Sequence, residues 1–242
     1  MEKPKLWMIP QTTQDDFVQL EVKEKQLFAR LRDISNAYQQ IKFASSLAVE
    51  DMVITDVIAK TKAKITVFTL ETGQLNPETL ALLSVLKNTY PQLDFELFYP
   101  DTQAIKHYEE QKGKFAFYES VALRRECCYL RKIEPLNRAL ASADCWLTGQ
   151  RRSQSTTRTT LPFYEQDESR QIAKYNPIYD WSENEVWAYI LKYQIPYNAL
   201  YEQGFPSIGC APCTAPVKAG DDIRAGRWWW ENKDSKECGL HK

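Results

Sequence analysis

Hydrophobic positions along this chain follow two different periods, and the segments that carry them alternate. Helical spacing, with apolar residues three to four positions apart, predicts helices over residues 21–40, 48–60, 77–90, 118–130, 132–141 and 182–193. Short runs rich in β-branched and aromatic residues lie between several of these helices and predict strands over residues 41–46, 64–70, 94–100 and 145–149. Strands that alternate with helices indicate an α/β fold, a mostly parallel sheet with helices on both faces.

The pattern changes after Ile195, where proline, glycine and cysteine follow one another with little periodicity. A length of 242 residues suits one hydrophobic core with appendages. We therefore expect an α/β domain over residues 1–213, which includes an N-terminal extension, and a C-terminal segment over 214–242. The last residues, "KDSKECGLHK", are mostly polar and predict a mobile tail that carries Cys238 and His241.

Composition and charge exclude several classes of protein. The chain is 43% hydrophobic and 26% charged, and its net charge of −1 gives no general attraction to nucleic acid. No apolar run reaches the length of a membrane helix, and the N-terminus lacks the apolar core of a signal peptide. These features predict a cytoplasmic protein with no nucleic-acid or membrane partner, in which any bound anion is met by local charges.

Two loops after predicted strands have the composition of anion sites. Ligands of open α/β sheets bind beyond the carboxyl ends of the strands. The loop "SSLAVED" offers Ser45, Ser46 and backbone N–H groups at the start of a helix, although it lacks the glycines of a Walker loop and a simple helix cap explains either serine equally well. The loop "TGQRRSQSTTRTTLPFY" holds Arg151, Arg152 and Arg158 with no acid before Glu165, which favours anion binding over an ordinary solvated loop.

The cysteines form two pairs and two single residues. Cys127 and Cys128 are adjacent, and Cys210 and Cys213 form C-x-x-C, so four thiolates are available for one metal centre. A redox dithiol and chance core packing are the alternatives for each pair taken alone. Adjacent cysteines are uncommon in zinc ribbons, and the spacing therefore favours an iron–sulfur cluster over zinc. Cys145, at the start of an apolar strand, is expected to fill the core.

Several segments together resemble a known family. They are "FASSLAVEDMV", "LETGQLNPET", "ECCYLRKIEPL", "TGQRRSQS", "YNPIYDWSENEVW", "IPYNALYEQGFPSIGCAPCT", "RAGRWWWE" and "KECGLH". They are similar to assimilatory adenylyl-sulfate reductases, the iron–sulfur branch of the adenylyl-sulfate and phosphoadenylyl-sulfate reductase family. The similarity leaves mainly the N-terminal stretch uncovered. Glu71 and Asn76 depart from the family, which often has Asp and His there.

This resemblance implies a fold, a cofactor and a reaction. The fold is that of the adenine-nucleotide alpha-hydrolases, and the cofactor is a [4Fe-4S] cluster on the four paired cysteines. The reaction is reduction of adenylyl sulfate to sulfite and AMP, in assimilatory sulfate reduction, with thioredoxin or glutaredoxin as the electron donor. The catalytic residue is Cys238, which carries an S-sulfonate intermediate that the mobile tail presents to the donor. The resemblance leaves a homo-oligomer open.

The resemblance also assigns roles to individual residues. Ser45 and Ser46 lie near the phosphosulfate, and the backbone of Leu70 and Gly149 lies near the adenine. Charge on the substrate and on the thiolate is stabilised by Arg158, Arg224 and Arg227. Lys132 lies between cluster and substrate, and His241 lies close to the nucleophile. The residues expected to bind substrate are Ser45, Ser46, Leu70, Lys132, Gly149, Arg151, Arg158, Arg224, Arg227 and His241.

Other functions remain open at this point. The basic loop over residues 151–158 suits an additional phosphate, so a phosphoadenylyl-sulfate reductase or a dual-specificity enzyme is the first alternative. A tRNA sulfur transferase would need a glycine-rich pyrophosphate loop, and a non-catalytic iron–sulfur or zinc protein would leave Cys238 without a role. The run Trp228–Trp230 has three alternative roles: it packs the tail onto the body of the protein, it forms a docking surface for thioredoxin, or it fills the core. We favour packing of the tail, because large aromatic side chains are most often buried.

Overall fold

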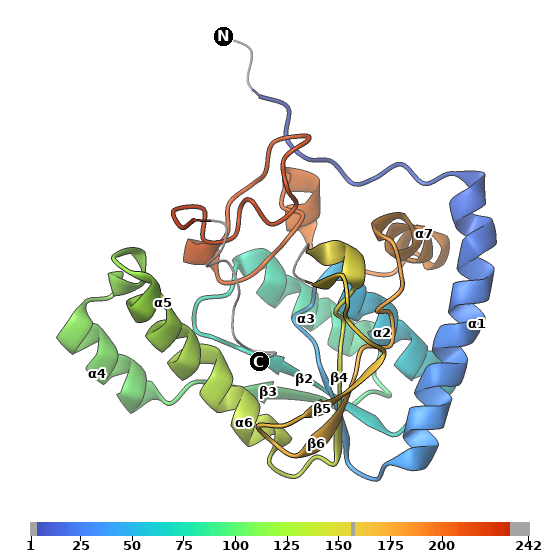
Figure 1. Ribbon diagram of the computed structural model, residues 1–242, viewed down its shortest axis with the longest axis horizontal. Helices are drawn as coiled ribbons and strands as arrows, with labels where there is room; N and C mark the ends of the chain where they lie inside the picture. The colour runs from blue at the N-terminus through green and yellow to red at the C-terminus, as the bar shows by residue number, and fades with distance from the viewer. Residues whose placement is uncertain (1–3, 156–157, 233–242) are drawn as a thin grey trace.

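A six-stranded sheet lies at the centre of the protein, with helices on both faces (Figure 1). The computed structural model describes residues 4–155 and 158–232. The strand order is β3-β2-β1-β4-β6-β5, and β5 runs antiparallel to β6 while the other neighbours are parallel. The predicted α/β fold with a mostly parallel sheet is thereby confirmed.

The elements follow the predicted alternation closely. The strands are β1 (Ile41–Ala44), β2 (Ile65–Leu70), β3 (Phe95–Phe98), β4 (Cys145–Thr148), β5 (Tyr164–Asp167) and β6 (Ile172–Tyr175). The helices are α1 (Gln14–Ala37), α2 (Val49–Thr61), α3 (Pro77–Thr89), α4 (Thr102–Lys112), α5 (Val121–Cys128), α6 (Glu134–Leu140) and α7 (Glu183–Tyr193). A π-helical turn, Tyr129–Ile133, joins α5 to α6.

Alternate residues of each strand enter two different cores. Phe43 of β1 and Val67 of β2 are fully buried in the larger core, which they share with apolar residues of α1, α2, α3 and α7. Phe68 and Trp146 point to the opposite face and pack against Leu136 and Leu140 of α6. Because side chains alternate along a strand, one short apolar run supplies both faces, and the central strands read as continuous hydrophobic segments.

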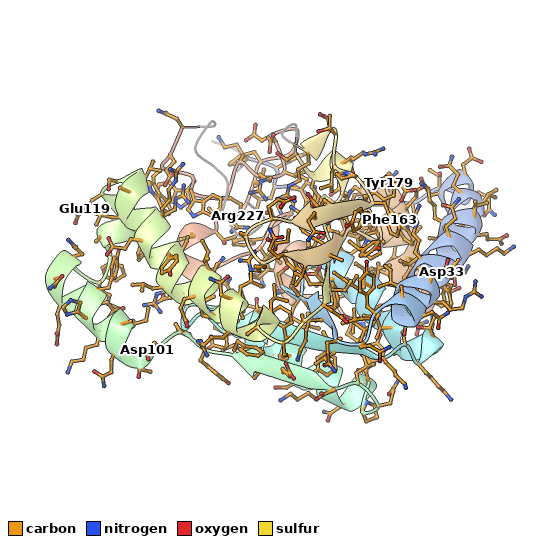
Figure 2. All side chains as sticks on the ribbon, turned by 60° about the horizontal axis from the view of Figure 1, so that its bottom comes forward. Asp33, Asp101, Glu119, Phe163, Tyr179 and Arg227 are labelled. Carbon is orange, nitrogen blue, oxygen red and sulfur yellow. The ribbon has the colours of Figure 1, made fainter. Side chains whose placement is uncertain are left out.

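The sequence analysis missed helix α4 and the β5–β6 hairpin. Polar residues dominate α4 and β5, so neither shows a clear apolar period. The hairpin depends instead on the pairing of its two strands. Glu165 lies opposite Lys174 in the antiparallel register, and its Oε1 atom forms an ion pair with Lys174 Nζ at 2.9 Å. Figure 2 shows Phe163, at the start of this hairpin, beside Tyr179 on the α1 side of the sheet, where their rings are 6.0 Å apart.

The chain after α7 folds back over the carboxyl ends of the strands. It forms two short 3₁₀ turns, Ala199–Gln203 and Ala211–Cys213, and then an isolated bridge between Thr214 and Arg227. A second bridge pairs Leu6 of the N-terminal extension with Lys218. This arrangement brings the described part of the C-terminal segment next to the strand ends. No helix in the described residues is long and apolar enough to cross a membrane.

Candidate active site

A pocket opens at the carboxyl ends of β1, β2 and β4, the edge where parallel α/β sheets bind ligands. Its walls come from the loops after these strands, from the π-helical turn and from the C-terminal segment. Of the ten residues expected to bind substrate, eight line it: Ser45, Ser46, Leu70, Lys132, Gly149, Arg158, Arg224 and Arg227. The ninth, Arg151, lies behind the pocket wall, and the tenth, His241, lies outside the described residues together with the proposed nucleophile Cys238.

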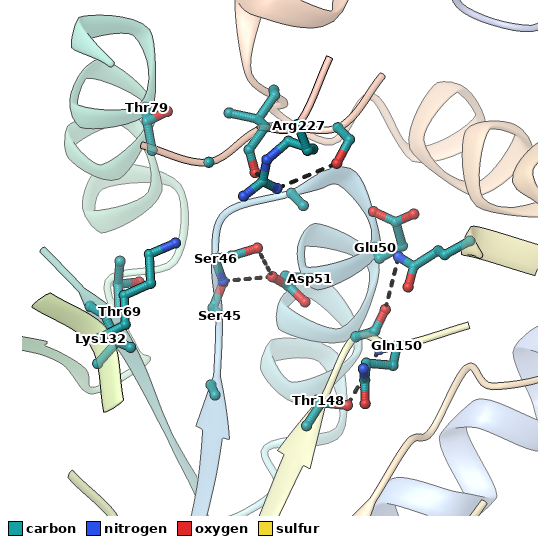
Figure 3. A pocket seen from close by; sticks show the side chains of 18 of the residues that line it. Ser45, Ser46, Glu50, Asp51, Thr69, Thr79, Lys132, Thr148, Gln150 and Arg227 are labelled. Carbon is teal, nitrogen blue, oxygen red and sulfur yellow. Dashed lines mark hydrogen bonds between the residues drawn. The ribbon is translucent and has the colours of Figure 1, made fainter. Parts of the chain in front are cut away.

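The turn after β1 is held by an acid that the sequence analysis did not single out. Both the backbone N–H and the hydroxyl of Ser46 donate to Asp51 Oδ2, at 2.6 and 2.7 Å (Figure 3). Neither serine caps helix α2, whose N-cap is Ala48 without a side-chain hydrogen bond. Asp51 therefore takes up the donors of Ser46, and an anion in the pocket has to be met mainly by side-chain cations.

Burial gives Asp51 an unusual acidity. It raises the pKa of Asp51 to about 7, and the charge of neighbouring Glu50 adds to the effect, while the hydrogen bonds from Ser46 oppose it. The same carboxylate restricts the facing loop, because a Cβ atom at Gly149 would overlap Asp51 Oδ1. A glycine is required here by the close approach of this loop to the first turn of α2.

Arg151 is neutralised inside the protein. Its Nη2 atom donates to Glu50 Oε1 at 2.6 Å, and its side chain is only 2% exposed. Burial on its own would raise the pKa of Glu50, but the Arg151 charge and hydrogen bonds from Gln154 and Arg151 outweigh burial and leave that pKa lowered. Arg152 stacks over Tyr179 at 4.6 Å. The expected cationic loop thus contributes one of its three arginines, Arg158, to the pocket lining.

Four cations face the pocket from three different segments. They are Lys132, Arg158, Arg224 and Arg227. Figure 3 shows Lys132 and Arg227 reaching toward the space beside Ser45 and Ser46 from different sides. Arg227 fits because its neighbour is Gly209, where a Cβ atom would overlap the guanidinium. Since the two acids of the lining, Glu50 and Asp51, are engaged inside the protein, the pocket suits an anionic ligand.

Some buried polar atoms of the lining have no hydrogen-bond partner within the described residues. They are Thr69 Oγ1, Gln150 Oε1 and Arg227 Nε. Buried polar groups are nearly always satisfied, so such atoms in a pocket indicate where a polar ligand or ordered water binds. Thr69 and Gln150 directly neighbour Leu70 and Gly149 in the sequence, the two residues expected beside the adenine.

The four paired cysteines gather beside the pocket. Cys210 and Cys213 share a small buried cluster with Phe117 and Trp228, and Cys127 packs against it. Cys128 is buried next to Arg124, which donates to it. The five described cysteines, these four and Cys145, are free thiols. No three described Cys, His, Asp or Glu side chains form a group that could hold a single metal ion.

Burial makes two of these thiols, Cys127 and Cys213, poor acids. It raises the pKa of Cys213 to about 12, with the nearby Cys210 adding to the effect and the charge of Lys132 opposing it. The pKa of Cys127 is also raised by burial, against the charges of Arg131 and Lys132. A bound metal centre would reverse this preference, because thiolates that ligate metal are deprotonated.

The π-helical turn connects the thiols to the pocket. Cys128 ends α5, and the wider turn that follows carries Lys132 into the pocket lining. Arg131 fixes the turn by donating to the carbonyl oxygen of Thr72 and to Glu109, both at 2.8 Å. The sequence analysis treated this stretch as ordinary helix, since no residue pattern in one sequence marks a π-turn. Such turns are often found at functional sites.

Gly149→Ala tests the close approach of the loop after β4 to the first turn of α2. The added methyl group meets Asp51, and overpacking of this kind typically costs ~1–3 kcal/mol. We expect nucleotide affinity to fall by about tenfold or more, measured by calorimetric titration. The control is Gly113→Ala, outside the pocket lining, where a Cβ atom meets open space but the φ of 98° strains the backbone. It should destabilise the protein and keep the wild-type affinity, which separates a local effect on binding from general destabilisation. Equal affinities for all three proteins would show that the approach is unimportant.

Asp51→Asn tests the buried carboxyl. The pKa of Asp51 is about 7 when folded against a model value of 3.8, so the folded state holds a proton that the unfolded chain loses as the pH rises between these values. Wild-type stability should therefore decline relative to the variant from about pH 4 to about pH 7, because asparagine keeps an acceptor for Ser46 and does not ionise. Urea unfolding at several pH values measures the difference, and a pH-independent difference would contradict the assignment.

The comparisons with known proteins agree with this geometry. Residues 40–216 match the model of the phosphoadenosine phosphosulfate reductase domain. The chain is 60% identical over 240 residues to the adenosine 5'-phosphosulfate reductase of Neisseria meningitidis, covering 99% of this chain and 98% of the relative. It is 50% identical to the enzyme of that name from Burkholderia cepacia, covering 92% of this chain and 89% of the relative.

Solved structures support the same relationship. A phosphoadenylyl-sulfate reductase from Candida auris, solved as a phosphate complex, superposes with a TM-score of 0.68 at 26% identity, covering 85% of this chain and 99% of the other. The FMN adenylyltransferase of Candida glabrata, at 12% identity and a TM-score of 0.60, covers 94% of this chain and 81% of its own and shares the fold alone. The resemblance noted in the sequence is confirmed, and the chain belongs to the phosphoadenosine phosphosulfate reductase family.

Proposed function

We propose that this protein reduces adenylyl sulfate to sulfite and AMP, with thioredoxin or glutaredoxin as the electron donor. The observation that carries the proposal is the contact between two sites: a pocket lined by four cations, at the strand ends of a nucleotide-binding fold, lies directly beside four thiols, three of them buried. The relatives named adenosine 5'-phosphosulfate reductase, which match nearly the whole chain, support the choice of substrate. The proposed setting is assimilatory sulfate reduction in the cytoplasm.

The substrate would lie across the strand ends with its anionic half on the cations. The adenine would occupy the space between Leu70 and Gly149, and the phosphosulfate would lie among Lys132, Arg224 and Arg227. These charges stabilise the phosphate oxygen as it becomes the leaving group. Glu50 and Asp51, the two acids of the lining, are engaged with Arg151 and Ser46, which supports an anionic group at this place.

Sulfur transfer is proposed to occur in two displacements at the thiol of Cys238. Its thiolate attacks the sulfonyl sulfur, the bond from that sulfur to the phosphate oxygen breaks, and AMP leaves while the sulfonate stays on the cysteine. A thiolate of the donor then attacks the Cys238 sulfur and releases sulfite, forming a mixed disulfide. The second donor thiol resolves it, so that one dithiol supplies both electrons and becomes a disulfide. His241 is proposed to lie close to the nucleophile.

The paired cysteines fit a [4Fe-4S] cluster. Cys127, Cys128, Cys210 and Cys213 supply four thiols, and Trp228 and Trp230 beside them each bury an indole N–H that has no acceptor among the described residues. Thr72 Oγ1 lies 3.4 Å from Cys210 Sγ. Buried donors without acceptors suit a group rich in sulfur acceptors. When bound, the cluster would supply a fixed structural and electrostatic centre beside Lys132, without a change of its redox state in turnover.

Replacing one paired cysteine tests the cofactor. Anaerobically purified wild-type protein should contain iron and acid-labile sulfide in similar amounts, and Cys210→Ser should lose both because one of four ligands is removed. The matched control is Cys145→Ser, a buried cysteine of strand β4 that lies in the main core and should keep the wild-type content. Metal and sulfide analysis of the three proteins decides the matter. A protein that holds zinc alone would contradict the cluster.

The reaction is tested directly with adenylyl sulfate and reduced thioredoxin. Wild-type protein should release sulfite, with a higher kcat/KM for adenylyl sulfate than for its 3'-phosphorylated form. Cys238→Ser should bind nucleotide and keep its iron but release no sulfite, because a hydroxyl is a far poorer nucleophile than a thiolate. Substantial turnover by this variant would exclude the two-step mechanism. Preference for the 3'-phosphorylated nucleotide would instead assign the activity of the Candida auris relative.

A further inference from the structure

A buried ion pair ties the cysteine helix to the end of the described chain. Arg124 of α5 donates from Nε to Glu231 Oε1 at 2.7 Å and from Nη2 to Glu231 Oε2 at 3.0 Å. The two side chains are 0% and 4% exposed. Arg124 lies three residues before Cys127, and Glu231 lies seven residues before Cys238. The pair therefore joins the last described turn of the chain to the helix that carries two of the paired cysteines.

The turn that presents Glu231 is fixed from several directions. Trp228 lies between two guanidinium groups, with Arg124 Cζ 4.6 Å and Arg227 Cζ 4.8 Å from its ring. Its φ of 43° lies in the left-handed region, which a bulky side chain occupies only where its surroundings hold it. The Glu231 N–H closes the turn on the Trp228 carbonyl at 2.8 Å, and the Trp228 N–H donates to the Cys213 carbonyl at 3.2 Å.

We propose that Arg124 and Glu231 form a clasp that positions Cys238 for attack on the substrate. This inference rests on the proposed function. A chain of seven residues spans at most about 25 Å, so the place where Glu231 is held decides which volume the thiol of Cys238 can occupy. Fixing that origin beside the pocket raises the effective concentration of the thiol at the substrate. Arg124 and Glu231 act in this way as positioning residues, without touching the substrate.

The chemistry of the clasp is better suited to fixing the position of the C-terminal segment than to stabilising the folded protein. A buried ion pair gains little over apolar side chains of similar volume, because both charges are removed from water. Its two parallel hydrogen bonds do fix distance and direction, as bidentate arginine–carboxylate pairs do. Apolar packing of Trp228 alone would hold the segment close to α5 without fixing its direction.

The chain offers a matched control for the test. Arg138 and Glu134 of α6 form a bidentate pair with the same two distances, 2.7 and 3.0 Å, but their side chains are 47% and 34% exposed. The test compares the wild type with Glu231→Gln and Glu134→Gln in the full-length, iron-loaded protein. One measurement is the rate at which sulfonate appears on Cys238 in a single turnover with adenylyl sulfate and no reductant. The other is hydrogen exchange of the backbone amides at residues 228–232.

We expect Glu231→Gln to slow sulfonate formation at least tenfold and to speed amide exchange at residues 228–232 by a similar factor. Nucleotide affinity and iron content should stay within threefold of the wild type, and Glu134→Gln should match the wild type throughout. Faster exchange with an unchanged sulfonation rate would show a purely structural pair and overturn the proposal. Unchanged values of both would overturn it as well.

A second variant keeps the test decisive if Glu231→Gln does not fold or loses iron. Arg124→Gln combined with Glu231→Gln leaves no unpaired charge, and its two amides still hydrogen-bond to each other. Its sulfonation rate should be lower than that of the wild type, because the amide pair holds the segment less firmly than the ion pair. A rate equal to that of the wild type would overturn the proposal. If the wild type itself forms no sulfonate, the proposed function fails, and the exchange measurement still decides whether the pair fixes the segment.

Discussion

Two acids in the first turn of α2 organise the side of the pocket formed by the ends of β1 and β4. Glu50 holds Arg151 from the loop after β4, and Asp51 holds Ser46 from the turn after β1. Both loops are therefore fixed to one helix, and the missing side chain at Gly149 lets the loop after β4 approach that helix closely. Breaking a buried ion pair by removing one partner typically costs ~3–5 kcal/mol, so the geometry of the two strand ends depends on this one turn.

The same acids affect the charge of the pocket in a chain of net charge −1. A helix N-terminus favours negative charge, and Glu50, whose pKa is lowered, supplies that charge from within the protein. Each of the two acids is hydrogen-bonded within the protein, Glu50 to Arg151 and Asp51 to Ser46, although both belong to the pocket lining. The charge of the pocket lining thus depends on which side chains are paired inside the protein. The net charge of the whole chain has little influence on it.

The C-terminal segment completes the site from the other side. Arg227 reaches the pocket while the adjacent Trp228 packs among the thiols, so two neighbouring residues serve the two sites. The left-handed backbone at Trp228 makes this division possible, because it turns successive side chains in different directions. The π-helical turn does the same on the opposite wall, where Cys128 stays with the thiols and Lys132 enters the pocket.

Local patterns in the sequence were sufficient for much of this description. The apolar periods located four of the six strands and six of the seven helices, because those elements bury a regular face. Helix α4 and the β5–β6 hairpin escaped, since their stability comes from partners distant in sequence, such as Lys174 for Glu165. Residue type and spacing also marked the paired cysteines and most of the pocket lining, because thiols and strand-end loops have recognisable chemistry.

The sequence by itself determined the α/β fold, the family and the four cysteines that could share a centre, since each depends on periodicity or on a motif readable along the chain. Tertiary structure alone decided which arginine is neutralised by a buried acid. Arg151 and Arg158 lie in the same basic loop and look equivalent in sequence, yet a buried acid from another element neutralises Arg151, while Arg158 lines the pocket. Pairing between distant residues follows from how the chain packs, and no local pattern contains it.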